Sequence, residues 1–450
     1  MTLPRPVRAT GPRITRLVAE LAAADDAGRA ALTAEFWSEV EGVGTPLVEE
    51  AAGAAGHRVV TFLWRGHRAT RQVLLCGNRL ADREQLAGAL LEHVPGTDVW
   101  HLGLRLRADH RGSYRLAADI STKEPPTDPA GLQLRLRSLS VHAAADPLNS
   151  RRIARRWQRS DSSVFALPDA PDPAVASDAR GPDGAAGGRV ERCPVPSGAL
   201  GGLRDTWVYL PSGHPRGAGP PLPVLVLTDG DMWFGRLRLE RTLDALIADG
   251  SLPPLAVLAP DAVDRLTRRR ELGGRDAFVT FLAGELLPWA MGRWPLTADP
   301  AHTVVAGQRL GAVTALYAAL RRPDRFGAVL AQSAALSWRP GESGEPPLAE
   351  TPWPVTRSAA VPPLPVRVHL DVGLQEGPVL DHHRTLYEAL RTAGNQVTCA
   401  EFNGGHDYAC WEVALGRALV RLLGGATDGT AGPTGPTGTD GTTGGSVGRS

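Results

Sequence analysis

The residues from Gly307 to Gly311 have the spacing of a catalytic turn. They read Gly-Gln-Arg-Leu-Gly, an apolar strand pattern precedes them, and an alanine-rich helical pattern follows. In serine hydrolases, a Gly-x-Ser-x-Gly sequence between a strand and a helix holds the nucleophilic serine on a sharp turn. The glycines are needed there because strand and helix pass too closely for a Cβ atom. Arg309 stands where the serine would be, so the sequence predicts this turn without its usual nucleophile.

An acid and a histidine follow Arg309 in the chain order that such a turn favours, which is nucleophile, acid, histidine. Glu376 comes just after the strand pattern 366–373, and His406 lies in a loop after the last strand pattern. Asp371 is the reserve acid, although we expect it to lie within the strand. A single loop histidine or glutamate usually has no catalytic role. Their joint placement at two strand ends favours a catalytic pair.

The chemistry of Arg309 excludes an acyl-enzyme at this position. A guanidinium group has a pKa above ~12 and offers no lone pair to a carbonyl carbon. We also expect its charge to repel a protonated His406 and to draw Glu376 away from that histidine. Ser333 and Ser337 could replace the nucleophile only from the wrong side, because they follow the next strand, and we interpret them as ordinary loop serines.

An oxyanion hole is predicted beside the turn. Its donors would be the backbone N–H of Leu310 and an N–H near Gly230 or Asp231, which follow a buried strand pattern. A hydrolase without its triad retains a rate roughly 10³–10⁴-fold above that of water through such features. A water activated by His406 would therefore make a weak esterase at best.

The elements that must position these residues alternate between strand and helix from residue 190 to residue 423. Continuous apolar segments are typical of buried parallel strands, and amphipathic segments separate them. This alternation predicts a doubly wound α/β sheet of the α/β-hydrolase type. The segments that carry it are "PLPVLVLTDG", "LERTLDALIADG", "LAVLAP", "AFVTFLAGELLPWAMGR", "HTVVAG", "FGAVLAQS" and "HHRTLYEALRTAG".

The first 168 residues have a different pattern. After helical segments in 14–41, short alternating stretches such as "HRVVTFLWRG" and "DVWHLGLRLR" are separated by Gly, Asp and Pro. This pattern predicts a smaller β-sandwich domain over 1–168. Residues 169–189 read as a linker, and the Gly/Thr/Pro-rich tail 424–450 cannot bury a core and is expected to be disordered.

The same motifs resemble those of the enterochelin esterases, two-domain bacterial enzymes that hydrolyse ferric enterobactin and related siderophores in the cytoplasm. The resemblance extends over most of residues 31–422. The family's elbow is Gly-Gln-Ser-x-Gly-Gly, so this chain departs from it at Arg309 and Ala312. The matching segments are "FWSEVEGVGTPLVE", "VTFLWRG", "PGTDVW", "DPLN", "VLVLTDGDMWF", "LDALIADGSLPP", "RRREL", "ELLPW", "RPDRFGAVLAQS" and "EFNGGHDYACW".

The resemblance implies a ligand and its contacts. The ligand would be a ferric catecholate siderophore, so iron would enter only as part of it and no other cofactor is expected. Arg270 matches the arginine of the "RRREL" motif and would lie by the substrate cleft, with Arg268 and Arg269 as further cations. Trp233 could line the cleft or lie in the core, and we favour the cleft because it follows a strand end. The family's asparagine after "RRREL" is absent.

Composition excludes several other functions. A formal net charge of +1 favours neither nucleic acid nor a membrane surface, and no uncharged apolar run is long enough to span a membrane. The four cysteines form no CxxC pair, and His382 and His383 cannot face one metal, so no metal site is expected. We see no secretory signal and expect a cytoplasmic protein.

Three function classes stay open. The chain could be a siderophore esterase with a substitute mechanism, a non-catalytic siderophore-binding pseudoenzyme on the same scaffold, or an esterase D-type hydrolase or acyltransferase with another substrate. Because the members of a triad act as a unit, the loss of the serine favours impaired or absent turnover. The oligomeric state cannot be read from the sequence.

Overall fold

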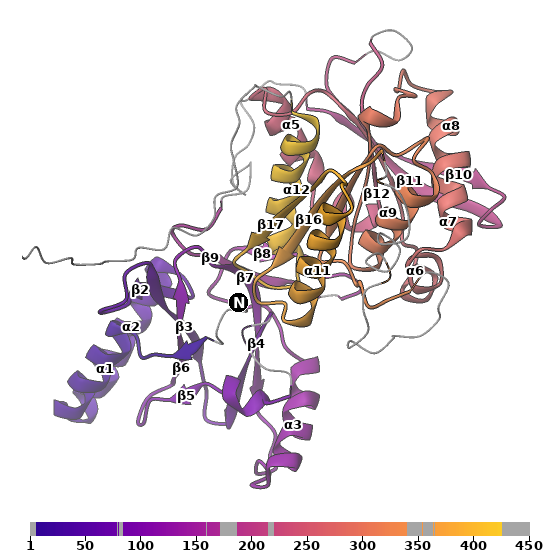
Figure 1. Ribbon diagram of the computed structural model, residues 1–450. Coiled ribbons are helices and arrows are strands. Elements are labelled where there is room, and N and C mark those ends of the chain that lie inside the picture. Colours follow the sequence, from indigo (N-terminus) through magenta and orange to yellow (C-terminus); the bar gives the residue numbers. More distant parts are fainter. Residues whose placement is uncertain are drawn as a thin grey trace, which may run out of the picture.

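The chain forms two lobes in the computed structural model, which describes residues 6–78, 80, 84–158, 160–171, 187–214, 220–339, 353, 363 and 365–424. Figure 1 shows a smaller N-terminal lobe of strands with helices at its edge, and a larger lobe in which helices cover both faces of one long sheet.

The N-terminal lobe contains two antiparallel sheets. One has the order β1-β6-β3-β2, with β5 paired to β6, and the other has the order β4-β7-β9-β8. Their strands are β1 (Val7–Arg8), β2 (Leu47–Glu50), β3 (His57–Arg65), β4 (Gln72–Gly77), β5 (Glu92–His93), β6 (Val99–Arg107), β7 (Arg111–Asp119), β8 (Arg152–Ile153) and β9 (Ser162–Ala166). Its helices are α1 (Pro12–Ala23), α2 (Asp26–Val43), η1 (Leu86–Ala89) and α3 (Pro129–Val141).

Aromatic rings from the two sheets meet in the core of this lobe. Phe62 on β3 packs edge-on against Tyr114 on β7, with ring centroids 4.8 Å apart, and against Phe165 on β9 at 5.6 Å. The inward residues of both sheets form one buried cluster. The lobe is therefore a β-sandwich, since each sheet buries its apolar face against the other.

The larger lobe is built on an eight-stranded sheet with the order β10-β11-β13-β12-β14-β15-β16-β17. The pairs from β13 to β17 are parallel, while β10 and β11 are antiparallel additions at one edge. The strands are β10 (Arg189–Ser197), β11 (Gly202–Leu210), β12 (Val224–Leu227), β13 (Ala256–Pro260), β14 (Thr303–Gln308), β15 (Ala328–Gln332), β16 (Arg367–Gly373) and β17 (Val397–Phe402).

Helices cover both faces of this sheet, as Figure 1 shows. On one face α4 (Gly230–Trp233), α5 (Leu239–Ala248) and α12 (Tyr408–Leu423) bury alternate strand residues such as Leu225 and Val257. On the other face the intervening residues, such as Val226 and Leu258, are buried. The helices there are α7 (Asp276–Thr280), η2 (Phe281–Leu286), α8 (Leu287–Met291), α9 (Leu310–Arg321) and α11 (Pro378–Thr392); α6 (Arg265–Glu271) and η3 (Pro300–His302) complete the lobe.

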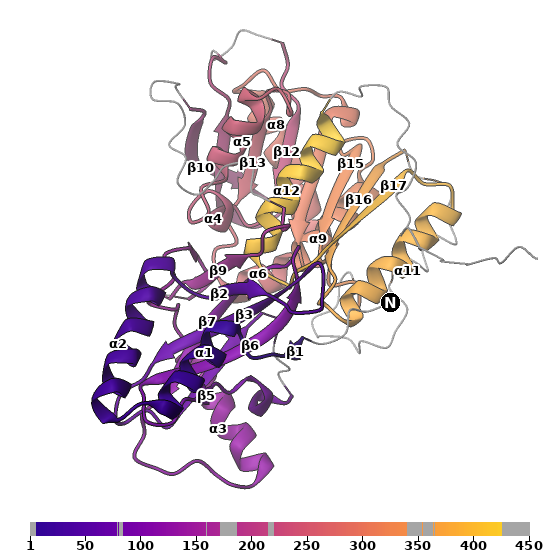
Figure 2. The same cartoon turned by 90° about the vertical axis from the view of Figure 1, so that its left-hand side faces the viewer.

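The predicted fold class is confirmed: an α/β-hydrolase sheet is preceded by a smaller β-sandwich. Of the expected linker 169–189, only 169–171 and 187–189 lie among the described residues, and β10 begins at Arg189. The expected tail lies outside the described residues except for Gly424. The two lobes meet where β7 and the start of α12 lie together, which Figure 2 shows from the side.

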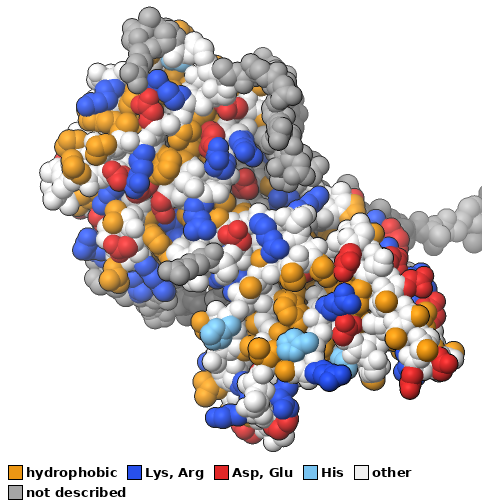
Figure 3. Space-filling model, turned by 180° about the vertical axis from the view of Figure 1, so that it is seen from behind, with side chains coloured by type: hydrophobic (Ala, Val, Ile, Leu, Met, Phe, Trp, Pro, Cys, Tyr) orange, Lys and Arg blue, Asp and Glu red, His pale blue; other side chains and the backbone are white. Residues whose placement is uncertain are grey.

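The surface carries charges of both signs. Figure 3 shows arginine and acidic side chains interspersed over the face seen from behind, in keeping with the net charge of +1. Within the described residues, no helix is long and apolar enough to cross a membrane.

Candidate active site

The turn at Arg309 has the geometry of a nucleophile elbow. Arg309 joins β14 to α9 with φ 56° and ψ −114°, a conformation that costs a non-glycine residue about 1–3 kcal/mol. A Cβ atom at Gly307 would lie 2.4 Å from the carbonyl carbon of Gly311, and one at Gly311 would lie 2.2 Å from Oγ1 of Thr228. Both glycines are therefore required by close packing. The Arg309 side chain at the tip of the turn is exposed.

Glu376 and His406 are brought together beside this turn. Nδ1 of His406 donates a hydrogen bond to Oε2 of Glu376, whose side chain is fully buried. The other carboxylate oxygen accepts hydrogen bonds from Oγ of Ser333 at 2.6 Å and from the N–H of Gly373 at 2.8 Å. Burial alone would raise the pKa of Glu376, but the hydrogen bond and charge of His406 and the other two donors outweigh it and lower that pKa. Glu376 is therefore held as a carboxylate, and our expectation that Arg309 draws it away from His406 is wrong.

Ser333 has a supporting position. It is fully buried after β15, with φ 46°, and its Oγ accepts a hydrogen bond from Nε1 of Trp411 at 2.8 Å while donating to Glu376. The half-buried Ser337 lies four residues further along the chain. Neither serine stands at the elbow, and the Ser333 hydroxyl proton is already used by the acid. Sequence analysis missed this role because the bond joins residues 43 positions apart.

Asp371 belongs to a buried ladder of polar side chains. Its carboxylate oxygens accept hydrogen bonds from Nε2 of His369 at 3.0 Å and from Nε2 of Gln332 at 3.1 Å. Oε1 of Gln332 accepts from Gln308 at 2.9 Å, and Oε1 of Gln308 accepts from Nε1 of Trp233 at 3.1 Å. Asp371 thus lies within β16 as expected. Trp233, fully buried at the end of this ladder, is a core residue and does not line the cleft as we expected.

The predicted oxyanion donors lie on two adjacent turns. Leu310 is the first residue of α9, and Gly230 and Asp231 begin α4. The strands before these turns, β14 and β12, are paired neighbours in the sheet. The first N–H groups of a helix have no partner within the helix, so they can bind an oxyanion. This placement fits the predicted role, and the role itself stays a prediction.

A buried carboxylate with two arginines lies next to α4. Asp229, with φ 70° and a fully buried side chain, binds Arg268 through two hydrogen bonds at 2.7 and 2.8 Å and Arg156 through an ion pair at 3.0 Å. Burial would raise the pKa of Asp229, but the two guanidinium groups outweigh it and lower that pKa. Arg156 comes from the N-terminal lobe and also donates to the Tyr408 hydroxyl. No local sequence signal could have revealed this contact.

The structure changes the interpretation of the arginine run on α6. Arg270, the residue that we expected beside the cleft, is exposed, and so is Arg269, which packs over Trp338. It is Arg268 that points inward, where its Nη2 also approaches the carbonyl oxygen of Gln308 at 3.3 Å. In a helix, two residues further along lie about 200° around the axis, so Arg268 and Arg270 face opposite sides. The contact to the elbow therefore belongs to Arg268.

The N-terminal lobe also holds the histidine loop. Nδ2 of Asn78 donates to the carbonyl oxygen of His406 at 2.9 Å, and the N–H of His406 donates to Oδ1 of Asn78 at 3.3 Å. Ser113 donates to Asp407 at 2.6 Å. The loop that presents His406 is thus fixed by side chains of another lobe. Within the described residues, no cluster of His, Cys, Asp or Glu has the arrangement of a metal site.

Family models match both lobes. The Esterase model covers residues 197–422, and the model for the N-terminal part of enterochelin esterases covers residues 59–175. Among curated proteins, the chain is 34% identical to the iron(III) salmochelin esterase of Escherichia coli, over 86% of this chain and 93% of that protein. It is also 34% identical to the iron(III) enterobactin esterase of Dickeya dadantii, over 88% of this chain and 94% of that protein.

Comparison with solved structures also gives esterases of this kind as matches. The ferric enterobactin esterase of Salmonella typhimurium matches with a TM-score of 0.72 at 29% identity, covering 86% of this chain and 98% of that one. The enterobactin esterase of Shigella flexneri, solved in the presence of enterobactin, matches with a TM-score of 0.71 at 26% identity, over 86% and 97%. With both lobes matched in order over most of its length, this chain belongs to the enterochelin esterase family.

Proposed function

We propose that this protein binds ferric catecholate siderophores at the substrate cleft that the family resemblance implies beside Arg309, called the Arg309 cleft below, and does not hydrolyse them through an acyl-enzyme. The observation that carries the proposal is Arg309 at the tip of an otherwise intact elbow. Similar proteins are esterases of iron(III) enterobactin and iron(III) salmochelin, which supports a siderophore as ligand. In this proposal iron reaches the cleft only within the ligand, and a cytoplasmic location stays a prediction.

The charge of Arg309 suits this ligand. A ferric tris-catecholate is multiply anionic and presents aromatic faces, and a guanidinium group both pairs with anions and stacks on rings. The guanidinium groups of Arg156 and Arg268 are paired with Asp229, and Arg156 also lies 3.5 Å from the Asp231 carboxylate, so two carboxylates offset these two charges within the protein. Because Arg309 is exposed at the tip of the elbow, we expect it to make the main electrostatic contact with the ligand.

The second candidate function is slow hydrolysis by a water molecule. The observation that favours it is the intact hydrogen bond between His406 and the Glu376 carboxylate, which orients the imidazole as a general base. Without the serine, the oxyanion donors and binding would supply roughly 10³–10⁴-fold acceleration over water. This rate lies far below that of an esterase with a complete triad.

Hydrolysis and binding must be measured separately to test the proposal. Binding of ferric enterobactin is measured by quenching of tryptophan fluorescence, and its hydrolysis products are separated by chromatography. Both assays are run on the wild type, Arg309→Ser and the control Arg270→Ala. We expect the wild type and Arg270→Ala to bind without enzyme-like turnover, and Arg309→Ser to hydrolyse the ester. Turnover in Arg309→Ser should be lost again in Arg309→Ser/His406→Ala.

Two results would overturn the proposal. Enzyme-like hydrolysis by the wild type would show that another group replaces the serine, and a wild type that fails to bind ferric enterobactin would remove the siderophore as ligand. Slow wild-type hydrolysis that His406→Ala abolishes would instead support the water mechanism.

A further inference from the structure

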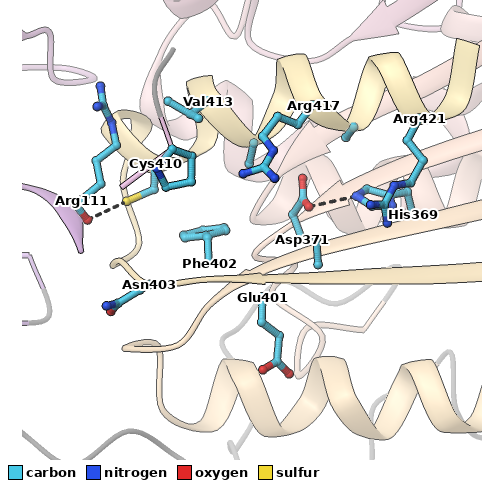
Figure 4. Close-up of a pocket in the computed structure, with 14 residues that line it drawn as sticks. Arg111, His369, Asp371, Glu401, Phe402, Asn403, Cys410, Val413, Arg417 and Arg421 are labelled. Atoms are coloured by element: carbon cyan, nitrogen blue, oxygen red, sulfur yellow. Dashed lines mark hydrogen bonds and ion pairs between the residues drawn. The ribbon is translucent and has the colours of Figure 1, made fainter. Parts of the chain in front are cut away.

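A pocket of about 140 Å³ lies away from the elbow, between β16, β17 and α12. Figure 4 shows Val413 and Arg417 on α12 above Phe402 and Asp371 on the strands, whereas Glu401 points away from α12. None of them belongs to the elbow, to the oxyanion turns or to the Glu376–His406 pair. The lining residues are Arg111, Pro171, His369, Asp371, Ala400, Glu401, Phe402, Asn403, Cys410, Val413, Ala414, Arg417, Ala418 and Arg421.

The pocket as a whole has room for one six-membered ring. One stripe of α12 lines it, at the i, i+3, i+4 spacing that places side chains on the same face of a helix. The Phe402 ring lies opposite, as Figure 4 shows. An apolar cavity of about 150 Å³ is known to hold benzene, so this volume admits a single aromatic ring. The apolar residues of the stripe are Cys410, Val413, Ala414 and Ala418, and Arg417 and Arg421 lie on the same face of the helix.

The carboxylates around the pocket already have partners. Glu401 binds Arg384 through two hydrogen bonds, at 2.6 and 2.7 Å. Asp371, at the floor, accepts from His369 at 3.0 Å and from Gln332 at 3.1 Å. The charge of Glu401 is thus paired with Arg384, and both oxygens of Asp371 already accept hydrogen bonds from the protein.

The two guanidinium groups at the mouth of the pocket, in contrast to these carboxylates, have no such partners within the described residues. Arg417 and Arg421 stand one helical turn apart on α12, both exposed, and neither has a hydrogen bond or ion pair within the described part of the chain. Arg111 on β7 lines the pocket with its backbone, since its carbonyl oxygen accepts from Sγ of Cys410 at 3.4 Å, while its side chain points away, as Figure 4 shows, and its Nε donates to the carbonyl oxygen of Ala409 at 2.7 Å. The pocket thus combines an apolar interior with uncompensated positive charge at its entrance.

We propose that this pocket is a binding site for a monocyclic aromatic carboxylate. The ring would pack between Phe402 and the apolar stripe of α12, and the carboxylate would pair with Arg417 and Arg421 at the mouth. Since Arg111 comes from the N-terminal lobe, a ligand here would contact both lobes. The site is separate from the Arg309 cleft, and the proposal does not depend on what that cleft binds.

Benzoate is the probe for this site, measured by isothermal titration calorimetry on the full chain. We expect one benzoate per chain for the wild type and for Arg309→Ser. Arg417→Ala should weaken binding about tenfold or more, because it removes a charge-assisted hydrogen bond. Ala414→Phe should abolish binding, since its ring fills the pocket. Arg391→Ala, which removes an exposed arginine on α11, serves as the control and should leave binding unchanged.

The nature of the ligand is tested with analogues. Benzamide, which has the ring without the charge, and acetate, which has the charge without the ring, should each bind at least tenfold more weakly than benzoate. Binding that is lost in Arg309→Ser but retained in Ala414→Phe would place benzoate in the elbow cleft and overturn the proposal. If the wild type does not bind benzoate at millimolar concentration, the proposal is also overturned. The unfolding midpoint of each variant shows whether it is folded.

Discussion

Removing the hydroxyl of Ser333 tests whether this serine supports the acid or is an incidental loop residue. In Ser333→Ala, the carboxylate of Glu376 loses the hydrogen bond of 2.6 Å and Nε1 of Trp411 loses its acceptor at 2.8 Å. The alanine side chain can occupy the same space, because a hydroxyl is replaced only by hydrogen. The change therefore isolates two hydrogen bonds in a fully buried site.

The size of the effect follows from those two bonds. A hydrogen bond to a charged group contributes about 1.5–3 kcal/mol, and a buried donor left without an acceptor costs about 1–3 kcal/mol. We therefore expect Ser333→Ala to lower the free energy of unfolding by about 3–5 kcal/mol. For a domain of this size that corresponds to a fall in Tm of roughly 6–20 °C.

The stability difference between wild type and Ser333→Ala should also change with pH in a definite direction. The pKa of Glu376 is lowered in the folded chain, so its stabilising contribution is complete above the unfolded pKa and is lost as pH falls through the folded pKa. Loss of the Ser333 hydroxyl raises the folded pKa toward its ordinary value. The difference in stability between wild type and Ser333→Ala should thus be largest at neutral pH and smaller below about pH 4.

Thermal unfolding and urea unfolding at about pH 7 and below about pH 4 measure these differences, with Ser337→Ala as the matched control. Ser337 is half-buried on the same segment, and its substitution should change stability by less than about 0.5 kcal/mol. If Ser333→Ala proves no more destabilising than Ser337→Ala, the supporting role of Ser333 is wrong.

Three further substitutions test the surroundings of the site. Gly307→Ala should destabilise the chain by several kcal/mol, because the added Cβ atom would overlap backbone atoms. Gly284→Ala is the control and should not destabilise it, because there is open space around Gly284. Unfolding midpoints of the two variants are compared. Arg268→Ala should lower the free energy of unfolding by about 3–5 kcal/mol, because it breaks a buried ion pair. Arg270→Ala removes an exposed side chain and should lower it by less than about 0.5 kcal/mol, and unfolding of both variants measures the difference. His110 is buried in the turn between β6 and β7, with Nδ1 3.1 Å from Oδ1 of Asn403. Burial lowers the pKa of His110 from 6.5, so the stability that its neutral ring supports should fall as pH drops below 6.5. A wild type whose stability is no more sensitive to pH than that of His110→Gln between about pH 7.5 and 5.5 would contradict this.

Much of the site could be predicted because its signals are local. The glycines around Arg309 and the strand ends before Glu376 and His406 are visible within short stretches of sequence. The fold then brings these strand ends together, since the carboxyl ends of parallel strands meet at one edge of a sheet. The same logic placed Asp371 correctly within its strand.

The supporting contacts could not be predicted because they join distant residues. Asn78 contacts His406 across 328 positions, and Arg156 contacts Tyr408 across 252. Arginine and asparagine are common on surfaces, so nothing in their types indicates a buried role. Trp233 was misplaced for a related reason: a strand end predicts the edge of the sheet, but not whether the next side chain faces solvent or core.

The hydrogen bonds that hold the elbow and Glu376 decide how much hydrolytic activity a serine at position 309 could restore. The elbow is held through the backbone: the N–H of Arg309 donates to the carbonyl oxygen of Gln332 at 3.2 Å, and the N–H of Ala335 donates to the carbonyl oxygen of Arg309 at 3.3 Å. A serine makes both bonds equally well. Glu376 is held by Ser333 and Gly373, which a change of side chain at the elbow does not alter. Arg309→Ser therefore changes the reacting group and leaves its supports in place, so failure to regain hydrolysis would locate the defect in the cleft and not in the scaffold.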